Sequence, residues 1–267
     1  MEPAVRTAMS FEDVTELAGE EISSEQLGRL FNRYHWTAEN CAGMDVLEVA
    51  CGAGAGLGYV ARRAKSVVAG DYSPTIVDAA LAHYGQRFDI RCFDAQEIPF
   101  EDGSFDVVVM HEALYYVPDA EKFVRECRRV LRPKGQILLT NSNKDLYDFN
   151  PSPHATVYHG AVELAELLGK WRFSVELFGA APLGEVNWRQ RLTRPVKWLA
   201  VRLNLIPKTM RGKRLLKRLI FGRPTIMPAE IVPDMAPIEL LTPIPADQPC
   251  LTHKIIYCRA TLIEASA

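Results

Sequence analysis

Three acidic residues, Glu48, Asp71 and Asp94, each lie at the end of a short apolar run that is typical of a buried strand. A carboxylate can hold the hydroxyl, amino or cationic group of a ligand. In an open parallel sheet the carboxyl ends of the strands meet along one edge, and ligands bind there. We therefore expect the three side chains to converge on one ligand, although each acid alone would also suit a turn or a helix cap.

A glycine-rich loop follows the first carboxylate, with glycines at positions 52, 54 and 56. Glycine lets the backbone turn sharply and approach a ligand closely. A dinucleotide-binding loop would have a glycine at position 57, where this chain has Leu57. A carboxylate at the end of the first strand does not suit pyrophosphate, whereas it suits an ammonium or sulfonium group.

The second and third acids fit a nucleoside. Asp71 lies 23 residues after Glu48 and suits a bidentate hydrogen bond to ribose hydroxyls. Tyr72 can lie against an adenine ring. Asp94 can accept the adenine amino group, while the backbone N–H of Ala95 donates to a ring nitrogen.

Short apolar runs alternate with amphipathic stretches, which predicts an α/β fold with a doubly wound, mainly parallel sheet and helices on both faces. The seven expected strands are 46–50, 67–70, 90–93, 105–110, 136–140, 173–178 and 254–262. The expected helices are 10–40, a segment from the glycine loop to about 65, 73–84, 120–131 and 162–168, with a turn at 133–135.

The chain divides into four predicted parts. Residues 1–40 form a helical cap, 41–182 the core, 183–250 a basic and proline-rich insertion, and 251–267 the final strand. Positions 186 to 229 hold twelve Lys or Arg and no acid, so with a net charge of −2 the remainder carries −14. We expect helices near 195–205 and 209–221 in the basic part, and extended irregular chain over 224–249, which has seven prolines.

Composition narrows the class of protein further. Of 267 residues, 48% are hydrophobic and 24% are charged, which excludes a disordered or fibrous chain. No apolar run approaches the ~18 residues of a membrane span, and no signal peptide is recognisable, so we expect a soluble cytoplasmic protein. Six widely spaced cysteines predict reduced, mostly buried thiols, and no histidine spacing indicates a metal site.

Taken together, the chain resembles a class I S-adenosylmethionine-dependent methyltransferase of the type-11 methyltransferase domain, over about residues 27–182 and the last strand. Three stretches carry the resemblance: 46–54, 100–108 and 129–135. Ala50 and Lys134 stand where the family has glycines. We expect a small cost at Ala50 if it has strand geometry, and none for the cofactor at Lys134.

The resemblance implies a Rossmann-like sheet of seven strands and S-adenosyl-L-methionine as the cofactor. Arg33 and Tyr34 would close over the cofactor from the N-terminal helix. The implied cofactor-binding residues are Tyr34, Glu48, Ala50, Gly52, Gly54, Asp71, Tyr72, Asp94, Ala95 and His111.

Methyl transfer is an in-line displacement, so alignment of the two reactants supplies most of the catalysis. A neutral amine needs no base, but a sugar or aliphatic hydroxyl does. The predicted catalytic residues are His111, Glu112, His154 and His159, with His111 as the first choice of base, and Tyr115, Asn141 and Tyr158 lie on the same loops.

The basic insertion is the main clue to the acceptor. We predict transfer to an oxygen or nitrogen atom of a small-molecule, sugar or lipid-linked acceptor, with the Lys and Arg residues at a phosphate or an anionic membrane surface. RNA is the alternative anionic partner. A nicotinamide-dependent oxidoreductase and a cofactor-binding protein without transferase activity are further alternatives.

Overall fold

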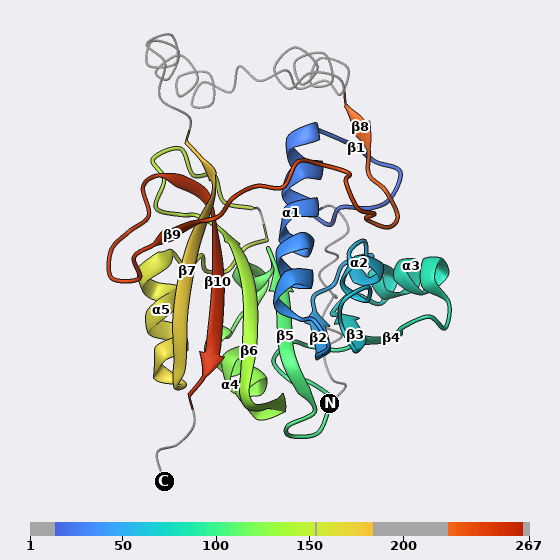
Figure 1. Ribbon diagram of the computed structural model, residues 1–267, viewed down its shortest axis with the longest axis horizontal. Coiled ribbons are helices and arrows are strands. Elements are labelled where there is room, and N and C mark those ends of the chain that lie inside the picture. Colours follow the sequence, from blue (N-terminus) through green and yellow to red (C-terminus); the bar gives the residue numbers. More distant parts are fainter. Residues whose placement is uncertain (1–13, 153, 184–223, 264–267) are drawn as a thin grey trace, which may run out of the picture.

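The computed structural model describes residues 14–152, 154–183 and 224–263. One twisted sheet runs through the middle of the protein, with helices against both of its faces (Figure 1). In the described residues it has eight strands in the order β4-β3-β2-β5-β6-β10-β7-β9. Their bounds are β2 (Asp45–Val49), β3 (Ser66–Asp71), β4 (Asp89–Cys92), β5 (Phe105–His111), β6 (Leu131–Ser142), β7 (Phe173–Pro182), β9 (Thr242–Ile244) and β10 (His253–Leu262).

The first five of these strands are parallel to one another. The first of these strands in the chain, β2, lies in the middle of the parallel part of the sheet. β3 and β4 follow on one side of it, and β5 and β6 then follow on the other side. β10 runs antiparallel between β6 and β7. The order of strands therefore reverses between β2 and β5, which is where open α/β sheets bind their ligands.

Two apolar layers hold the helices on the sheet. One cluster contains β5 and β6 side chains with Phe123, Cys127 and Leu164 from the helices below them. The other contains Leu30, Phe31 and Val77 from the helices of the opposite face. The first layer belongs to α4 (Ala120–Val130) and α5 (Ala161–Lys170), and the second to α1 (Ser24–Asn40), α2 (Leu57–Val60) and α3 (Pro74–Tyr84).

Several predicted boundaries were wrong. The predicted helix over 10–40 is wrong for the described residues 14–23, since α1 starts at Ser24, where Ser23 and Gln26 form a capping box. α2 ends at Val60, and residues 61–64 continue as hydrogen-bonded turns rather than as a regular helix.

Two segments of the extended proline-rich region pair with other strands. β9 is an eighth strand of the sheet, and β8 (Thr225–Ile226) pairs with β1 (Glu21–Ile22) in a separate two-stranded sheet. Pro243 is tolerated in β9 because that strand pairs with β7 alone and lies at the edge of the sheet.

Residues 224–250 also form a belt across the N-terminal helix, visible in Figure 1 as the orange and red segment that passes over α1. The backbone N–H of Glu239 donates to Asn32 Oδ1 at 2.7 Å, and Asn32 Nδ2 donates to the carbonyl of Pro237 at 3.1 Å. Earlier in the belt, Glu230 forms an ion pair with Arg87 at 2.9 Å. The belt therefore fixes α1 against the sheet.

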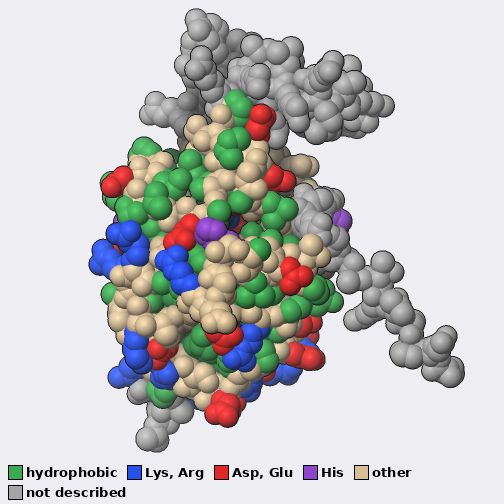
Figure 2. Space-filling view, turned by 90° about the vertical axis from the view of Figure 1, so that its right-hand side faces the viewer, with side chains coloured by type: hydrophobic (Ala, Val, Ile, Leu, Met, Phe, Trp, Pro, Cys, Tyr) green, Lys and Arg blue, Asp and Glu red, His purple; other side chains and the backbone are tan. Residues whose placement is uncertain are grey.

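The basic helices predicted near 195–205 and 209–221 lie outside the described residues. The division of the chain into cap, core, insertion and final strand stays a prediction. On the face shown in Figure 2, basic and acidic side chains of the described residues are interspersed.

Both departures from the family's glycines have left-handed backbone. Ala50 has φ 56°, so the expectation of strand geometry at this position was wrong. Lys134 has φ 64° and lies between Leu131, which pairs with Phe105, and Gln136, which pairs with Val107. The predicted turn at 133–135 is thus a bulge inside β6. A side chain in this conformation costs about 1–2 kcal/mol per residue.

Candidate active site

A cavity of about 670 Å³ opens at the carboxyl ends of the parallel strands. Its wall is made by the loops after β2, β3, β4, β5 and β6, by one face of α1, by the first part of β10, and by residues 14–16 and Met227. This volume lies within the range of about 300–1,000 Å³ that is usual for small-molecule sites. The predicted site residues in its wall are Tyr34, Ala50, Gly52, Asp71, Tyr72, Asp94, Ala95, His111, Glu112 and His154.

Asp71 is held by backbone donors on both of its oxygens. Gly52 N donates to Oδ2 at 3.0 Å, and Ser73 N donates to Oδ1 at 3.1 Å. Burial raises the pKa of the Asp71 carboxyl, which the two N–H groups partly offset. Gly52 has φ 58°, and a Cβ there would meet only a methyl group of Thr15, at 3.4 Å. The loop after β2 therefore needs glycine for its backbone conformation.

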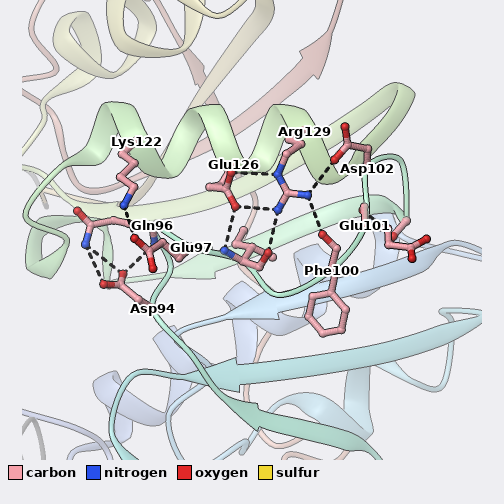
Figure 3. A network of polar contacts seen from close by, with 11 residues as sticks. Asp94, Gln96, Glu97, Phe100, Glu101, Asp102, Lys122, Glu126 and Arg129 are labelled. Carbon is pink, nitrogen blue, oxygen red and sulfur yellow. Dashed lines mark hydrogen bonds and ion pairs between the residues drawn. The ribbon is translucent and has the colours of Figure 1, made fainter.

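Asp94 belongs to a loop that is fastened to α4. Its Oδ1 accepts from the backbone and the side chain of Gln96, at 2.8 and 3.0 Å, and Gln96 Oε1 accepts from Asp119 N at the start of α4. Lys122, in the first turn of α4, forms an ion pair with Glu97 at 2.7 Å, as Figure 3 shows.

Arg129 closes the same network further along α4 (Figure 3). It pairs with Glu126 at 2.7 Å and with Asp102 at 3.0 Å, and it donates to the carbonyl of Phe100 at 2.7 Å. The loop that presents Asp94 is thus braced against α4 along the residues that follow Asp94.

Glu48 lies beneath the cavity and is not among its lining residues. It is 2% exposed, and Tyr34 donates its hydroxyl to Glu48 Oε1 at 2.6 Å. Burial raises the pKa of Glu48 to about 7. The Tyr34 ring occupies the space beside Gly56, where a Cβ would come within 2.0 Å of it. Glu48 thus faces Tyr34, and Tyr34 faces the cavity.

Gly54 likewise does not line the cavity. Its carbonyl accepts from the Tyr84 hydroxyl at 2.8 Å, which ties the glycine loop to α3. Of the three acids predicted to converge on one ligand, the structure brings Asp71 and Asp94 to the cavity and places Glu48 one layer below.

His111 is enclosed by hydroxyl groups. Thr37 Oγ1 lies 2.9 Å from Nε2, and Thr140 Oγ1 lies 3.2 Å from Nδ1. The Tyr34 ring stands edge-on at 5.1 Å. Burial, together with Arg33, holds the pKa of His111 well below its usual range, so the ring is neutral. Both ring nitrogens are engaged with protein groups.

Glu112 follows β5 in a left-handed conformation, with φ 50°. Ser142 donates to Oε2 at 2.6 Å, and the Tyr115 hydroxyl donates to the same oxygen at 3.2 Å. Oε1 is buried and has no hydrogen-bond partner in the described part of the chain. The carboxylate is therefore oriented on one side and has an unused acceptor on the other.

His154 lines the cavity, whereas His159 does not. His159 is partly buried, and burial lowers its pKa. Its carbonyl accepts from Asn141 Nδ2 at 3.4 Å. Among the described residues, no group of three or more His, Cys, Asp or Glu could hold a metal ion.

Sequence reasoning missed several residues of the wall. Arg29 comes from α1, one turn before Arg33, and Tyr257 comes from β10. Ser142 ends β6, and Gln96 follows Asp94 by two residues. A helical-spacing pattern could have placed Arg29 on the face of Arg33, but no sequence signal brings β10 to this position.

A family model described as a methyltransferase domain matches residues 47–139. The chain is 38% identical over 164 residues to a probable S-adenosylmethionine-dependent methyltransferase of Mycolicibacterium smegmatis, covering 58% of this chain and 63% of that one. It is 37% identical over 129 residues to phthiotriol/phenolphthiotriol dimycocerosates methyltransferase 1 of Mycobacterium ulcerans, covering 45% and 46%.

A third relative is the ubiquinone biosynthesis O-methyltransferase of Xanthomonas euvesicatoria, 34% identical over 141 residues and covering 51% of this chain and 57% of that one. The matches thus span less than two thirds of each of these relatives. The crystal structure of the YcgJ protein of Bacillus subtilis shares the fold, with a TM-score of 0.56, 17% identity, and coverage of 87% of this chain and 99% of that one.

Proposed function

We propose that this chain is a class I S-adenosylmethionine-dependent methyltransferase, and that it transfers the methyl group of that cofactor to an oxygen atom of a small-molecule or lipid-linked acceptor. The printed names of its relatives support this range of acceptors, since they include an O-methyltransferase and a dimycocerosates methyltransferase. One observation carries the choice of oxygen: Glu112 lines the cavity, and its buried Oε1 has no hydrogen-bond partner among the described residues.

The residues present fit the cofactor. Asp71 and Asp94 offer carboxylates in the cavity wall, and Gly52 adds no side chain of its own beside them. Asp71 would hold the ribose, and Asp94 with the backbone of Ala95 would hold the adenine. Tyr34, backed by Glu48, would face the amino-acid end.

When bound, the cofactor supplies an electrophilic methyl group: the acceptor oxygen bonds to the methyl carbon as the carbon–sulfur bond breaks and its electron pair goes to sulfur. In this proposal Glu112 takes the acceptor's proton at Oε1, while Ser142 and Tyr115 hold Oε2 in place. An aliphatic hydroxyl needs such a base and an amine does not. We propose His111 as a neutral wall residue rather than the base, because Thr37 and Thr140 engage its nitrogens.

The basic stretch of residues 186–223 supports a lipid-linked or phosphorylated acceptor through its charge alone. RNA methylation rests on the same charges and remains the alternative. In the part of the chain that the structure describes, no helix is long and apolar enough to cross a membrane.

The direct test is a screen for labelled-methyl transfer from S-adenosylmethionine to pools of sugars, phenols and lipids, with RNA as a separate pool. We expect a methyl ether product, identified by mass spectrometry. Calorimetry with S-adenosylmethionine and with NAD should show binding of the first alone. Transfer to nitrogen or to RNA, or tighter binding of NAD, would contradict the proposal.

A further inference from the structure

We propose that Tyr158 is a positioning residue: its ring holds Tyr115 in place, and Tyr115 in turn orients the carboxylate of Glu112. The inference rests on the proposed function, in which Glu112 takes the proton of the acceptor. It adds to that function a residue outside the cavity wall. Tyr158 would thus act through Tyr115 and not on the acceptor itself.

Tyr158 lies behind the cavity wall. Tyr115 and Tyr116 belong to the turn that follows β5, and both line the cavity, whereas Tyr158 does not. The rings of Tyr115 and Tyr158 are stacked, with their centroids 4.3 Å apart and their planes 22° from parallel. Tyr115 is only 7% exposed. Its ring is therefore supported from behind by Tyr158.

Two contacts within the loop between β6 and α5 fix the Tyr158 ring. The Tyr158 hydroxyl accepts from Ser152 N at 3.0 Å. The ring of Phe149 meets that of Tyr158 edge-on, with centroids 4.6 Å apart and an angle of 78° between the planes. Stacked and edge-on aromatic pairs stabilise a fold beyond the area they bury. The loop thus holds Tyr158 before Tyr158 holds anything else.

The same contacts form a closed circuit between the loop and the turn after β5. Ser152, whose backbone N–H holds Tyr158, also forms a hydrogen bond through Oγ with the hydroxyl of Tyr116, at 2.7 Å. The Tyr116 ring lies 4.6 Å from the Tyr115 ring at an angle of 62°. The circuit then returns to Tyr158 through the stacked pair. A displacement of one ring therefore disturbs the others.

Thr156 fastens the loop to the same turn through the backbone. Its N–H donates to the carbonyl of Tyr115 at 2.7 Å. Its hydroxyl lies 3.0 Å from that carbonyl and 3.1 Å from the carbonyl of Val117. The backbone of Tyr115 is thus held without Tyr158, which leaves the direction of the Tyr115 ring to the stacked pair.

The direction of this ring matters because its hydroxyl reaches Glu112. It donates to Oε2 at 3.2 Å, which is long for a hydrogen bond between two oxygens. Ser142, at the end of β6, donates to the same oxygen at 2.6 Å. A shift of the Tyr115 ring would lengthen the weaker of the two bonds further and loosen the carboxylate.

Other groups also act on Glu112, and they can be kept constant. Arg33 of α1 and Tyr257 of β10 both interact electrostatically with its carboxylate. Neither belongs to the aromatic circuit, so substitution of Tyr158 leaves both in place. Burial raises the pKa of the Tyr158 hydroxyl, so Tyr158 is neutral and brings no charge of its own to Glu112.

The test measures the protonation of Glu112 and needs no acceptor. The side-chain carboxyl carbons of glutamate would be labelled with ¹³C and followed by NMR through a pH titration. The signal of Glu112 is the one that Glu112→Gln lacks. A carboxylate that loses a donor binds its proton more tightly. Tyr115→Phe should therefore raise the titration midpoint by about half to one pH unit, the size of one hydrogen bond.

Tyr158→Leu removes the stacked ring and should raise the midpoint in the same direction, by roughly half as much. In the Tyr115→Phe background it should add nothing, because the hydrogen bond is already absent. Tyr158→Phe keeps the ring and should leave the midpoint as in the parent protein. Tyr147→Leu is the matched control, since Tyr147 is an exposed tyrosine of the same loop.

Phe149→Leu is the second variant, which serves if Tyr158→Leu does not fold. It loosens the Tyr158 ring without removing it and should give a smaller shift in the same direction. A midpoint that moves in neither variant would overturn the proposal, and so would an unchanged midpoint in Tyr115→Phe. A shift by Tyr158→Leu that persists in full in the Tyr115→Phe background would also reject it, because Tyr158 would then act without Tyr115.

The proposed function is judged separately, by the product of methyl transfer. Midpoint shifts of the expected kind without transfer to oxygen would keep the role of Tyr158 toward the carboxylate and reject the proposed function. Transfer to oxygen that Glu112→Gln abolishes, with midpoints that do not respond to Tyr158, would keep the function and reject this inference.

Discussion

The two ends of the cavity are built in different ways. At the end formed by β3 and β4, each carboxylate is held by donors from its own neighbourhood: Asp71 by Ser73 and the adjacent Gly52, and Asp94 by Gln96. At the end formed by α1, β5, β6 and β10, the charged groups come from distant segments, and some of their buried atoms have no hydrogen-bond partner among the described residues.

In the proposed function the first end holds the cofactor and the second holds the acceptor. At the β3 and β4 end, the hydrogen bonds link neighbouring loops, as from Gly52 to Asp71, or a loop to the start of α4, as from Asp119 to Gln96. A site assembled from four segments depends on how those segments pack. Function is thus carried by the site and not by the fold alone.

The largest expected effect separates the two ends completely. Glu112→Gln should lower the rate of methyl transfer by about 10²–10⁴-fold, the usual contribution of a positioned base. Affinity for S-adenosylhomocysteine should stay within about twofold, since the substitution lies at the acceptor end. Single-turnover transfer and calorimetry would measure the two quantities.

Ser142→Ala is the companion variant, because it removes the 2.6 Å donor to Glu112 and leaves the carboxylate. Its rate should fall between those of the parent and Glu112→Gln. Unchanged transfer in Glu112→Gln would show that the acceptor needs no base, as expected of an amine.

The next largest effect concerns Glu48, beneath the cavity. Its pKa of about 7 lies above the ordinary value of 4.5, so the folded protein binds more protons than the unfolded chain between these values. Protonation of Glu48 therefore contributes to the free energy of unfolding. This contribution is fully present below pH 4.5 and is lost as the pH rises through 7, by up to about 3 kcal/mol.

Urea unfolding of the parent and of Glu48→Gln at pH 5 and pH 8 would isolate this contribution from those of other carboxyls. The difference in free energy of unfolding between the two proteins should change with pH in favour of Glu48→Gln at the higher pH. A difference that is independent of pH would show that Glu48 titrates normally in the fold.

At the cofactor end, Asp71→Asn should weaken S-adenosylmethionine binding about 10–100-fold, because a hydrogen bond to a charged group contributes about 1.5–3 kcal/mol. Asp89→Asn is the control, since Asp89 is exposed and pairs with Arg91 on β4. Calorimetry on both variants would measure the effect. Equal affinities in the two variants would remove Asp71 from the cofactor site.

The smallest expected effects are at the two positions that depart from the family's glycines. Ala50→Gly and Lys134→Gly should each raise the free energy of unfolding by about 1 kcal/mol, because both residues have positive φ. Only Ala50 lines the cavity, so only Ala50→Gly should also change cofactor affinity. Ala53→Gly is the control in the same loop, since Ala53 is not among the residues with positive φ. Destabilisation by Lys134→Gly would contradict this account.

Much of the sheet could be predicted because hydrophobic periodicity and strand–helix alternation are local. The run of Val107 to Met110, for example, is buried on both faces and reads as a central strand. β9 was not predicted, because a three-residue edge strand containing Pro243 has no pattern of its own and forms only by pairing with β7. The left-handed conformation of Ala50 was missed for a similar reason, since alanine itself gives no sign of positive φ.

The order of amino acids by itself determined the glycine loop and the acids near the ends of the strands, because each of these is a short-range pattern. It predicts the nucleoside chemistry of these acids. Tertiary structure alone decided that Glu48 lies under Tyr34 and that Arg29, Glu112 and Tyr257 share one wall. It did so because the pairing of β10 with β6 and the belt across α1 join residues far apart in the chain. Such contacts depend on packing, which no local pattern encodes.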